Sequence, residues 1–235
     1  MDWIDYYDSN HTIYVSALHR DLHFRIIAHD IIDYITDPDA VVIDYSCGEA
    51  LSAEDVAKAC GRLILAEPAP SVRERLSQRF AGSAKITVSS LDDLALLAPQ
   101  SVDLVVMNSV SQYMTPAQLE AALRLIRGLL KPTGRLVLGD VLNRDVGLFQ
   151  DAIALLRFAR RDGFLKDAVI GLVSTALSDY RRFRSRIGVQ TYSEASFAST
   201  IEAAGLVAQR AAKNIGHNPW RMTFIATPQS PGQAP

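Results

Sequence analysis

The sequence predicts an α/β fold in which a mostly parallel sheet carries helices on both of its faces. The first observation is an alternation, from about residue 40 onward, of short runs rich in Val, Ile and Leu with longer amphipathic segments. This alternation is typical of parallel strands joined by crossover helices. The second is composition: 49% of the 235 residues are hydrophobic, and 24 basic side chains nearly balance 26 acidic ones. Length and composition therefore favour one globular domain with additions and exclude disordered and fibrous classes.

Seven runs have the length and residue types of strands, and helical segments separate the first five of them. The expected strands are Val41 to Tyr45, Arg62 to Ala66, Lys85 to Ser89, Val102 to Asn108, Arg135 to Val141, Leu206 to Lys213 and Arg221 to Thr227. The expected helices of this part are Ala50 to Cys60, Ser71 to Phe80, Leu91 to Leu97, Pro116 to Lys131 and Ser193 to Ala204. Thr115 is placed to cap the helix that Pro116 begins, and Lys131-Pro132-Thr133-Gly134 is expected to stop it.

Two segments depart from the alternation. Tyr14 to Ile35 is expected to form a helix over the sheet edge or the site, and Val146 to Ile187 to form two long amphipathic helices with no strand between them. The predicted single domain, 1–228, thus comprises an N-terminal helical cover (1–37), a central core (38–142), a helical insertion (143–190) and a closing helix with two strands (191–228). The remaining 229–235 are rich in Pro, Gly and Gln and are expected to be disordered.

Targeting signals, apolar stretches and cysteines are the features of the sequence that bear on localisation. The acidic start of the chain does not support a secretory signal, and no stretch approaches the roughly 20 apolar residues of a membrane span. Cys47 and Cys60 lack metal-ligand spacing and suit a reducing compartment, so we expect a cytoplasmic protein without a bound metal.

The segment most informative about function is Val41 to Ala50, an apolar strand that runs into a turn of small residues and then a helix. In a sheet of this type ligands bind at the carboxyl ends of the strands, where a small turn lets backbone amides approach closely. Glu67 ends the next strand, nineteen residues beyond Gly48, where a carboxylate could accept hydrogen bonds from both ribose hydroxyls of a nucleoside. The two features together predict a nucleoside-type ligand.

These residues resemble the class I S-adenosylmethionine-dependent methyltransferases over roughly residues 38 to 142. The acidic residue and Gly-x-Gly-x-Gly turn of that family are similar to Asp44 through Ala50. Further similar stretches are Ser90-Leu91-Asp92-Asp93, Ser101 to Ser109, Val110-Ser111-Gln112-Tyr113-Met114 and Leu129 to Leu136. The resemblance implies a Rossmann-like, mostly parallel seven-stranded sheet with an antiparallel last strand, an N-terminal helix and a helical insertion.

The resemblance also implies a cofactor, S-adenosyl-L-methionine, and S-adenosyl-L-homocysteine as product. The backbone around Ser46 to Gly48 would hold the methionine moiety, Glu67 would hold the ribose, and 38–142 would be the cofactor-binding core. The cofactor residues implied by the similarity are Asp44, Ser46, Cys47, Gly48, Glu67, Pro68, Leu91, Asp92, Asn108 and Ser109.

The chain departs from the family pattern at three positions. Ser46 and Ala50 replace the first and third glycines, and Ser90 stands where many relatives have an acidic residue. Both replacements of glycine are small, so a close backbone approach is preserved if neither position requires a positive φ.

The function that follows is transfer of a methyl group from S-adenosylmethionine to a small or partly apolar acceptor. The alternative within the same fold is a non-catalytic S-adenosylmethionine-binding or scaffold protein. A nicotinamide-dependent oxidoreductase would require a fuller Gly-x-Gly-x-x-Gly turn, which the sequence lacks. Methyl transfer can depend on alignment alone or also use a base, so no catalytic residue is assigned from sequence.

Four side chains are candidates for contact with the acceptor. His19 and His23 share one helical face, where they would poise an acceptor, ligate a metal or form a plain structural row. Tyr113 follows the fourth strand together with Gln112. His217 lies with Asn218 in the loop before the antiparallel last strand, which topology brings to the same sheet edge, although a plain turn role is equally open.

The segment 144–190 combines basic and apolar residues. Its basic residues are Arg144, Arg157, Arg160, Arg161, Lys166, Arg181, Arg182, Arg184 and Arg186. One interpretation is a helical layer with solvated arginines; the other is peripheral contact with an anionic membrane, or an entry for a lipid-like or aromatic acceptor. Nucleic acid is disfavoured as a partner because no array of stacking aromatics is present.

Overall fold

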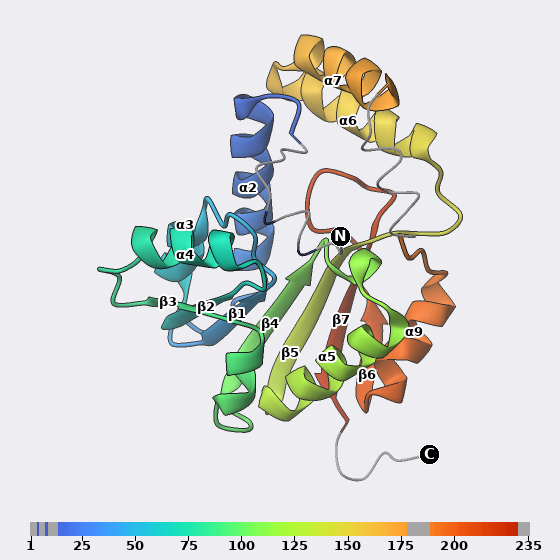
Figure 1. Ribbon diagram of the computed structural model, residues 1–235. Helices are drawn as coiled ribbons and strands as arrows, with labels where there is room; N and C mark the ends of the chain where they lie inside the picture. The colour runs from blue at the N-terminus through green and yellow to red at the C-terminus, as the bar shows by residue number, and fades with distance from the viewer. Residues whose placement is uncertain (1–3, 5–7, 9–13, 178–188, 230–235) are drawn as a thin grey trace.

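The computed structural model describes residues 4, 8, 14–177 and 189–229. Its centre is a seven-stranded sheet in the order β3-β2-β1-β4-β5-β7-β6 (Figure 1). The strands are β1 (Val41–Tyr45), β2 (Arg62–Ala66), β3 (Ile86–Ser89), β4 (Val102–Asn108), β5 (Leu130–Val141), β6 (Leu206–Arg210) and β7 (Met222–Pro228). The first five pair in parallel, and β7 pairs antiparallel with β5 and β6. The predicted fold class is confirmed.

The start of β5 differs from the prediction. The strand begins at Leu130, which pairs with Val102, so the residues 131–134 lie inside β5 and do not form a separate helix stop. The register between β4 and β5 shifts between Val102, which pairs with Leu130, and Leu104, which pairs with Arg135. This irregularity accommodates the extra residues of β5 where the chain passes directly from helix to strand.

Helices cover both faces of the sheet (Figure 1). They are α3 (Ala53–Ala59), α4 (Pro70–Arg79), the 3₁₀ helices η1 (Asp92–Leu96) and η2 (Ser111–Tyr113), α5 (Pro116–Leu129) and α9 (Glu194–Ala203). The expected start of α5 is confirmed, because the Thr115 hydroxyl accepts from the Gln118 N–H and the Gln118 side chain accepts from the Thr115 N–H. Along β1, Val42 packs in the cluster that includes α3 and α4, whereas Ile43 packs with α5 and α9, as alternation in a strand requires.

Three helices lie beyond the carboxyl ends of the strands. They are α2 (Ala17–Ile32), capped by Ser16, and the hairpin of α6 (Leu148–Asp162) and α7 (Leu165–Leu177), which runs across the top of the molecule in Figure 1. The predicted insertion is therefore helical and outside the sheet as far as residue 177. Its remaining part, 178–188, and the expected disordered tail from 230 onward lie outside the described residues.

A small apolar cluster holds this hairpin against α2. Phe158, Phe164 and their alanine neighbours are buried, and Leu22 and Ile26 of α2 pack against them. Gly163, with φ +87°, ends α6 in the left-handed conformation that favours glycine and turns the chain into α7. Within the described ranges, no helix has the length and apolar composition that crossing a membrane requires.

Candidate functional site

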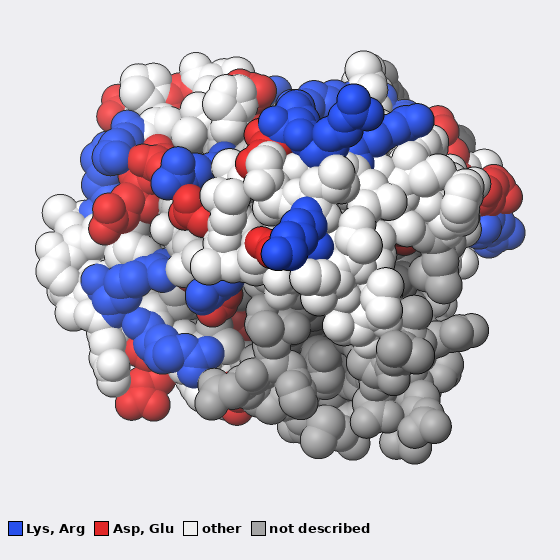
Figure 2. All heavy atoms as spheres, turned by 90° about the horizontal axis from the view of Figure 1, so that it is seen from above, with Lys and Arg blue, Asp and Glu red and all other residues white. Residues whose placement is uncertain are grey.

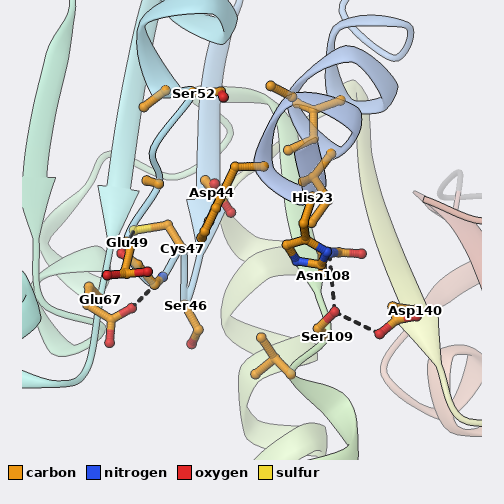
Figure 3. Close-up of a pocket in the computed structure, with 18 of the residues that line it drawn as sticks. His23, Asp44, Ser46, Cys47, Glu49, Ser52, Glu67, Asn108, Ser109 and Asp140 are labelled. Atoms are coloured by element: carbon orange, nitrogen blue, oxygen red, sulfur yellow. Dashed lines mark hydrogen bonds between the residues drawn. The ribbon is translucent and has the colours of Figure 1, made fainter. Parts of the chain in front are cut away.

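A cavity of about 520 Å³ opens at the carboxyl ends of β1, β2, β4 and β5 (Figure 3). The turns after these strands form its floor, and part of its wall is formed by Arg20 and His23 of α2 together with Tyr14, which precedes that helix. The position agrees with the general rule that ligands of parallel α/β sheets bind at the carboxyl edge.

The turn after β1 has left-handed backbone at every second residue. Ser46 has φ +58°, Gly48 +58° and Ala50 +42°. Ser46 and Ala50 were expected to replace glycine without cost if neither position required a positive φ. Both positions have a positive φ, a conformation that costs residues with a side chain about 1 to 2 kcal/mol each. Strain of this kind persists only where the surrounding structure fixes it.

Hydrogen bonds with the end of β2 and with α4 fix this turn. The Ser46 N–H donates to the carbonyl of Ala66 at 2.7 Å, and the Gly48 N–H donates to Glu67 Oε2 at 2.8 Å. From α4, the Arg79 guanidinium donates to the carbonyls of Glu49 at 2.9 Å and Ala50 at 2.6 Å. The turn therefore keeps the shape of a glycine-rich loop although two of its glycines are absent.

Two acidic side chains, Asp44 and Glu67, line the cavity beside this turn (Figure 3). Burial, and then the nearby Glu67 charge, raises the pKa of Asp44 to about 7. Burial also raises the pKa of Glu67, against hydrogen bonds from the Ala69 and Gly48 N–H groups that lower it. Among the described residues no hydrogen bond reaches the Asp44 carboxylate, so it does not cap the turn. The pair suits a ligand that brings hydroxyl groups or positive charge.

Arg20 and Glu49 close the cavity on the side of α2. The Arg20 guanidinium pairs with both carboxylate oxygens of Glu49, with Nε 2.7 Å from Oε2. Because Glu49 belongs to the turn after β1, this ion pair ties α2 to the residues on which the ligand would lie.

The far half of the cavity lies at the ends of β4 and β5. The Ser109 hydroxyl donates to Asp140 Oδ2 at 2.8 Å (Figure 3), and the Gln112 side-chain amide donates to the Ser109 carbonyl at 2.8 Å. Ser46 Oγ and Asn108 Oδ1 are buried and have no hydrogen-bond partner among the described residues. Buried polar atoms without partners are uncommon, and these two line a cavity, so they are available to a ligand.

The three histidines predicted near the site come together from two segments. The ring centroids of His19, His23 and His217 are 6.2 to 6.4 Å apart, and His217 stacks on Phe158 while His19 stacks on Phe164. Burial lowers the pKa of His19 to about 4, that of His23 to about 3 and that of His217 as well. The rings are therefore neutral near pH 7 and form an aromatic wall.

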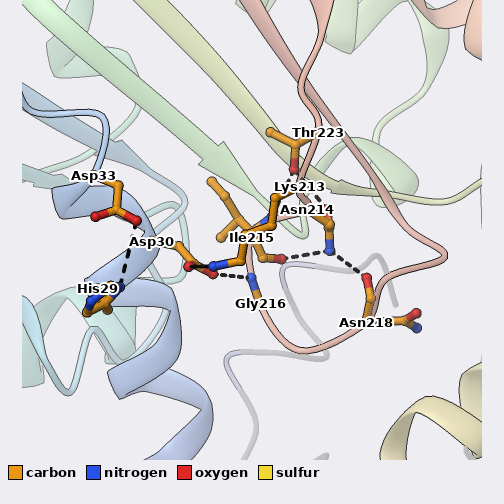
Figure 4. A network of polar contacts seen from close by, with 9 residues as sticks. All are labelled: His29, Asp30, Asp33, Lys213, Asn214, Ile215, Gly216, Asn218 and Thr223. Carbon is orange, nitrogen blue, oxygen red and sulfur yellow. Dashed lines mark hydrogen bonds and ion pairs between the residues drawn. The ribbon is translucent and has the colours of Figure 1, made fainter.

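The described residues bring only His29, Asp30 and Asp33 close enough together to share a metal ion. These residues lie outside the cavity, and Asp30 is already satisfied by the Lys213 ammonium and the Gly216 N–H (Figure 4). The group is thus explained as an ion-paired junction between α2 and the loop before β7.

That loop is built around buried Asn214 (Figure 4). Its side chain accepts from the Asp140 N–H and the Thr223 hydroxyl, and donates to the carbonyls of Ile215 and Asn218. The Asn218 side chain accepts from Trp220 and donates to Asp151 on α6, so it holds the loop and does not face the cavity. Of the two loop candidates, only His217 contacts the ring of His23, and His23 itself lines the cavity.

The structure brings together most of the predicted cofactor residues. The cavity is lined by Asp44, Ser46, Cys47, Gly48, Glu67, Asn108 and Ser109. Pro68, Leu91 and Asp92 do not line it: Pro68 offers its carbonyl to Arg73, and the other two begin η1 after β3. Cys47 is half-buried, and desolvation raises the pKa of its thiol, which fits packing better than nucleophilic chemistry.

Of the acceptor candidates, His23 and Tyr113 line the cavity, whereas His19 and His217 stand behind His23. Other lining residues received no role from the sequence: Tyr14, Arg20, Glu49, Asp140 and Arg221. The available signal was weak, since Asp140 lies next to the end of a predicted strand and Arg20 follows His19 on a predicted helix.

Comparison with known proteins identifies the core of this site. Residues 43–138 match the family model described as "Methyltransferase domain". No curated protein sequence matches. Among solved structures, the putative methyltransferase from a complex with the Haloferax volcanii Trm112 activator is 15% identical, with a TM-score of 0.61 over 97% of this chain and 99% of that one.

Two further structures share the fold at low identity. Magnesium protoporphyrin IX methyltransferase from Synechocystis PCC 6803, with bound SAM, is 13% identical, with a TM-score of 0.56 over 97% of this chain and 89% of that one. A possible exported protein from Bordetella parapertussis is 20% identical, with a TM-score of 0.58 over 90% and 68%.

Proposed function

We propose that the chain transfers a methyl group from S-adenosylmethionine to a small or partly apolar acceptor, on the premise that residues 43–138 match the methyltransferase domain model and that solved methyltransferases share the fold. The observation that carries the proposal is the acidic pair Asp44 and Glu67 beside an open, left-handed turn. A carboxylate pair with raised pKa values favours a ligand with a positive group and hydroxyls over an anionic one.

The residues present fit this cofactor. The Glu67 carboxylate already accepts two backbone N–H groups and keeps lone pairs for ribose hydroxyls. The unpartnered Ser46 Oγ and Asn108 Oδ1 face the same cavity. A Cβ at Gly48 would meet no protein atom within 4 Å, so the space beside it is open to a ligand. When bound, the cofactor supplies a methyl group on a positively charged sulfur.

The protein's own contribution is to bind, orient and exclude water. The turn from Ser46 to Gly48 would hold the amino-acid end, and Glu67 the ribose. Arg20 on α2, paired with Glu49, keeps the helix over the turn and shields it from solvent. The neutral ring of His23 leaves the acceptor side free of a competing positive charge. Alignment at this edge can then supply much of the rate enhancement.

Nicotinamide dinucleotides fit the site less well. Their diphosphate would lie at the first turn of α3, where Glu54 and Asp55 add negative charge beside Glu49. The alternative of a non-catalytic binding protein rests on three departures from the family pattern, at Ser46, Ala50 and Ser90. Because Ser46 and Ala50 adopt left-handed backbone all the same, the loss of two glycines does not collapse the turn.

Calorimetry tests the proposal directly. S-adenosylmethionine and S-adenosylhomocysteine should bind with micromolar or tighter affinity, while NAD should give no heat of binding. Release of S-adenosylhomocysteine during incubation with acceptor mixtures then separates an enzyme from a binding protein. Binding of NAD in preference to both adenosyl compounds would overturn the proposal.

We also propose that the outer face of α6 and α7 contacts an anionic membrane from which a partly apolar acceptor could enter. Five large apolar side chains of this hairpin are exposed: Phe149, Leu165, Val169, Ile170 and Val173. Figure 2 looks onto this side of the molecule and shows basic side chains gathered beside a broad uncharged area. Flotation with anionic vesicles should be weakened about tenfold by V169S with I170S. L96S, at an exposed leucine of η1, is the control; equal flotation of all three proteins would reject the contact.

A further inference from the structure

Gln112, Ser109 and Asp140 form a hydrogen-bonded group at the acceptor end of the cavity. Ser109 joins the other two, since its carbonyl accepts from Gln112 Nε2 at 2.8 Å and its hydroxyl donates to Asp140 Oδ2 at 2.8 Å. All three residues line the cavity. They come from the ends of β4 and β5, away from the acidic pair at β1 and β2.

The backbone of this group is strained. Ser109 has φ +59° and Asp140 has φ +55°, although neither is glycine. Asp140 lies in an irregularity of the β5–β7 pairing, where the register shifts between Leu138 and Val141. Such bulges occur beside active sites, where they redirect a side chain, and left-handed non-glycine residues persist where the surroundings hold them. Here the Asp140 N–H is held by the buried side chain of Asn214.

The group presents two oxygen atoms that lack hydrogen-bond donors. Gln112 is 5% exposed, and its Oε1 is buried without a partner in the part of the chain that the structure describes. Asp140 uses Oδ2 for Ser109, and its Oδ1 has no partner among the described residues. Leaving the buried Gln112 Oε1 unsatisfied is unfavourable, and Asp140 Oδ1 is a carboxylate oxygen on the same cavity, so both oxygens favour a ligand that carries N–H or O–H groups.

The surroundings disfavour an anionic acceptor. The Arg221 guanidinium, which also lines the cavity, is engaged through Nε and Nη2 by the Asp151 carboxylate at 3.0 and 2.7 Å. Arg20 is paired with Glu49 in the same way. A carboxylate acceptor would therefore meet the Asp140 charge while the neighbouring cations are already paired.

We propose that the methyl acceptor is an amine or a hydroxyl whose hydrogen atoms are bound by Asp140 Oδ1 and Gln112 Oε1, with Ser109 fixing both side chains. The inference rests on the proposed methyltransferase function. In the transfer, the acceptor nitrogen or oxygen forms a bond to the methyl carbon and the carbon–sulfur bond breaks with its electron pair left on sulfur. The acceptor proton passes to Asp140, directly in the case of a hydroxyl and after transfer in the case of an amine.

Headgroup preference is the first test. Purified protein receives S-adenosylmethionine with a tritiated methyl group and probes built on hexyl, phenyl and 2-naphthyl bodies, each with an aminomethyl, hydroxyl or carboxylate group. Label should enter amine or hydroxyl probes at least tenfold faster than the matched carboxylates. Label in the carboxylate esters, or in no probe while S-adenosylhomocysteine still binds, would overturn the acceptor assignment. Failure of S-adenosylhomocysteine to bind would instead overturn the proposed function.

Substitutions then separate the two oxygens, using the best probe. D140N keeps an acceptor for the Ser109 hydroxyl but cannot take up the proton, so kcat/KM should fall about 100-fold. Q112M keeps the side-chain length without the oxygen and should raise KM about tenfold with kcat changed less than about threefold. Both variants should bind S-adenosylhomocysteine with an affinity within about twofold of the wild type. If Asp140 and Gln112 had only a structural role, their substitution would lower this affinity as well.

D145N is the matched control, because Asp145 is an exposed aspartate five residues beyond Asp140. Its kinetic constants should equal those of the wild type. Wild-type kinetics in D140N would refute the role of Asp140, and a fall in kcat/KM of D145N as large as that of D140N would show a non-specific charge effect and refute it too.

Discussion

The two halves of the cavity are built in different ways. The half at β1 and β2 is formed by one short turn, from Asp44 to Ala50, and by Glu67 at the end of the next strand. The half at β4 and β5 takes residues from α2, from η2, from the bulge in β5 and from Arg221, which directly precedes β7. A motif can therefore specify the first half locally, whereas the second exists only after the sheet has formed. Both halves contain left-handed non-glycine residues, but only the first contains carboxyl groups whose pKa is raised by burial, so substitutions there should affect ligand binding most.

G48V should have the largest effect, a loss of S-adenosylhomocysteine affinity of more than about 100-fold without unfolding. Gly48 has φ +58°, which a β-branched residue strongly disfavours, and its open side faces the cavity. Calorimetry and circular dichroism measure the two outcomes. Gly82, also free of neighbours within 4 Å but outside the cavity, provides the control G82V. Equal affinities of the two variants would show that the turn does not hold the ligand.

Asp44 should make stability depend on pH. Its pKa is about 7 in the folded protein against 3.8 for an ordinary aspartate, so the unfolded chain loses its proton first as pH rises. The free energy of unfolding should fall between pH 4 and pH 7, by at most about 4 kcal/mol from this group, and stay low above pH 7. Urea unfolding at pH 5 and pH 8 should show a smaller fall in D44N than in the wild type.

The opposite outcome, an equal fall in both proteins, would mean that the Asp44 carboxylate is solvated in the folded state. D44N should also bind S-adenosylhomocysteine more weakly. The Asp44 carboxylate would then lower the free energy of unfolding above pH 4 and, at the same time, strengthen ligand binding.

E67A should weaken S-adenosylhomocysteine binding by about 1 to 3 kcal/mol through loss of charge-assisted hydrogen bonds. Because the Glu67 carboxylate also accepts the Gly48 and Ala69 N–H groups, part of the loss will come from the turn itself. E67Q keeps an acceptor oxygen and should lose less. E74A, at an exposed position of α4, serves as control in calorimetry; unchanged affinity in E67A would remove the ribose assignment.

The smallest effect is expected where glycine is restored. S46G and A50G should each stabilise the protein by about 0.5 kcal/mol, because relief of left-handed strain exceeds the added entropy of the unfolded chain. A81G, at a residue without positive φ, should destabilise by a similar amount. Chemical unfolding measures all three. Destabilisation of S46G and A50G equal to that of A81G would show that these positions carry no strain.

The sequence predicted the parts of the molecule that depend on local pattern. β1, β2 and β4 have the expected bounds, and the cap at Thr115 formed as expected. The positive φ values of Ser46 and Ala50 were not predicted, because they depend on Arg79 and Glu67, which are distant in sequence. The early start of β5 likewise depends on its pairing with β4.

The acceptor half was predicted least well for the same reason. His23 was placed near the site from its helical spacing, but Asp140 enters the cavity through a bulge that requires β7 as partner. Asn218, expected near the acceptor, instead forms hydrogen bonds with Asp151 and Trp220. Its loop meets Asp151 of α6 only in the folded chain, so the sequence could not show this contact.

The hairpin of α6 and α7 is attached to the rest of the molecule through a satellite cluster centred on Phe158 and Phe164, separate from the two large clusters that sandwich the sheet. Units with few buried contacts open by local unfolding at a free energy well below that of the whole domain. Amide hydrogens of this hairpin should therefore exchange with solvent earlier than those of β1 and β4. If this opening admits the proposed acceptor, the rate of acceptor entry is proportional to the equilibrium constant of opening. The composition of one small aromatic cluster would then set how fast the acceptor reaches the cavity.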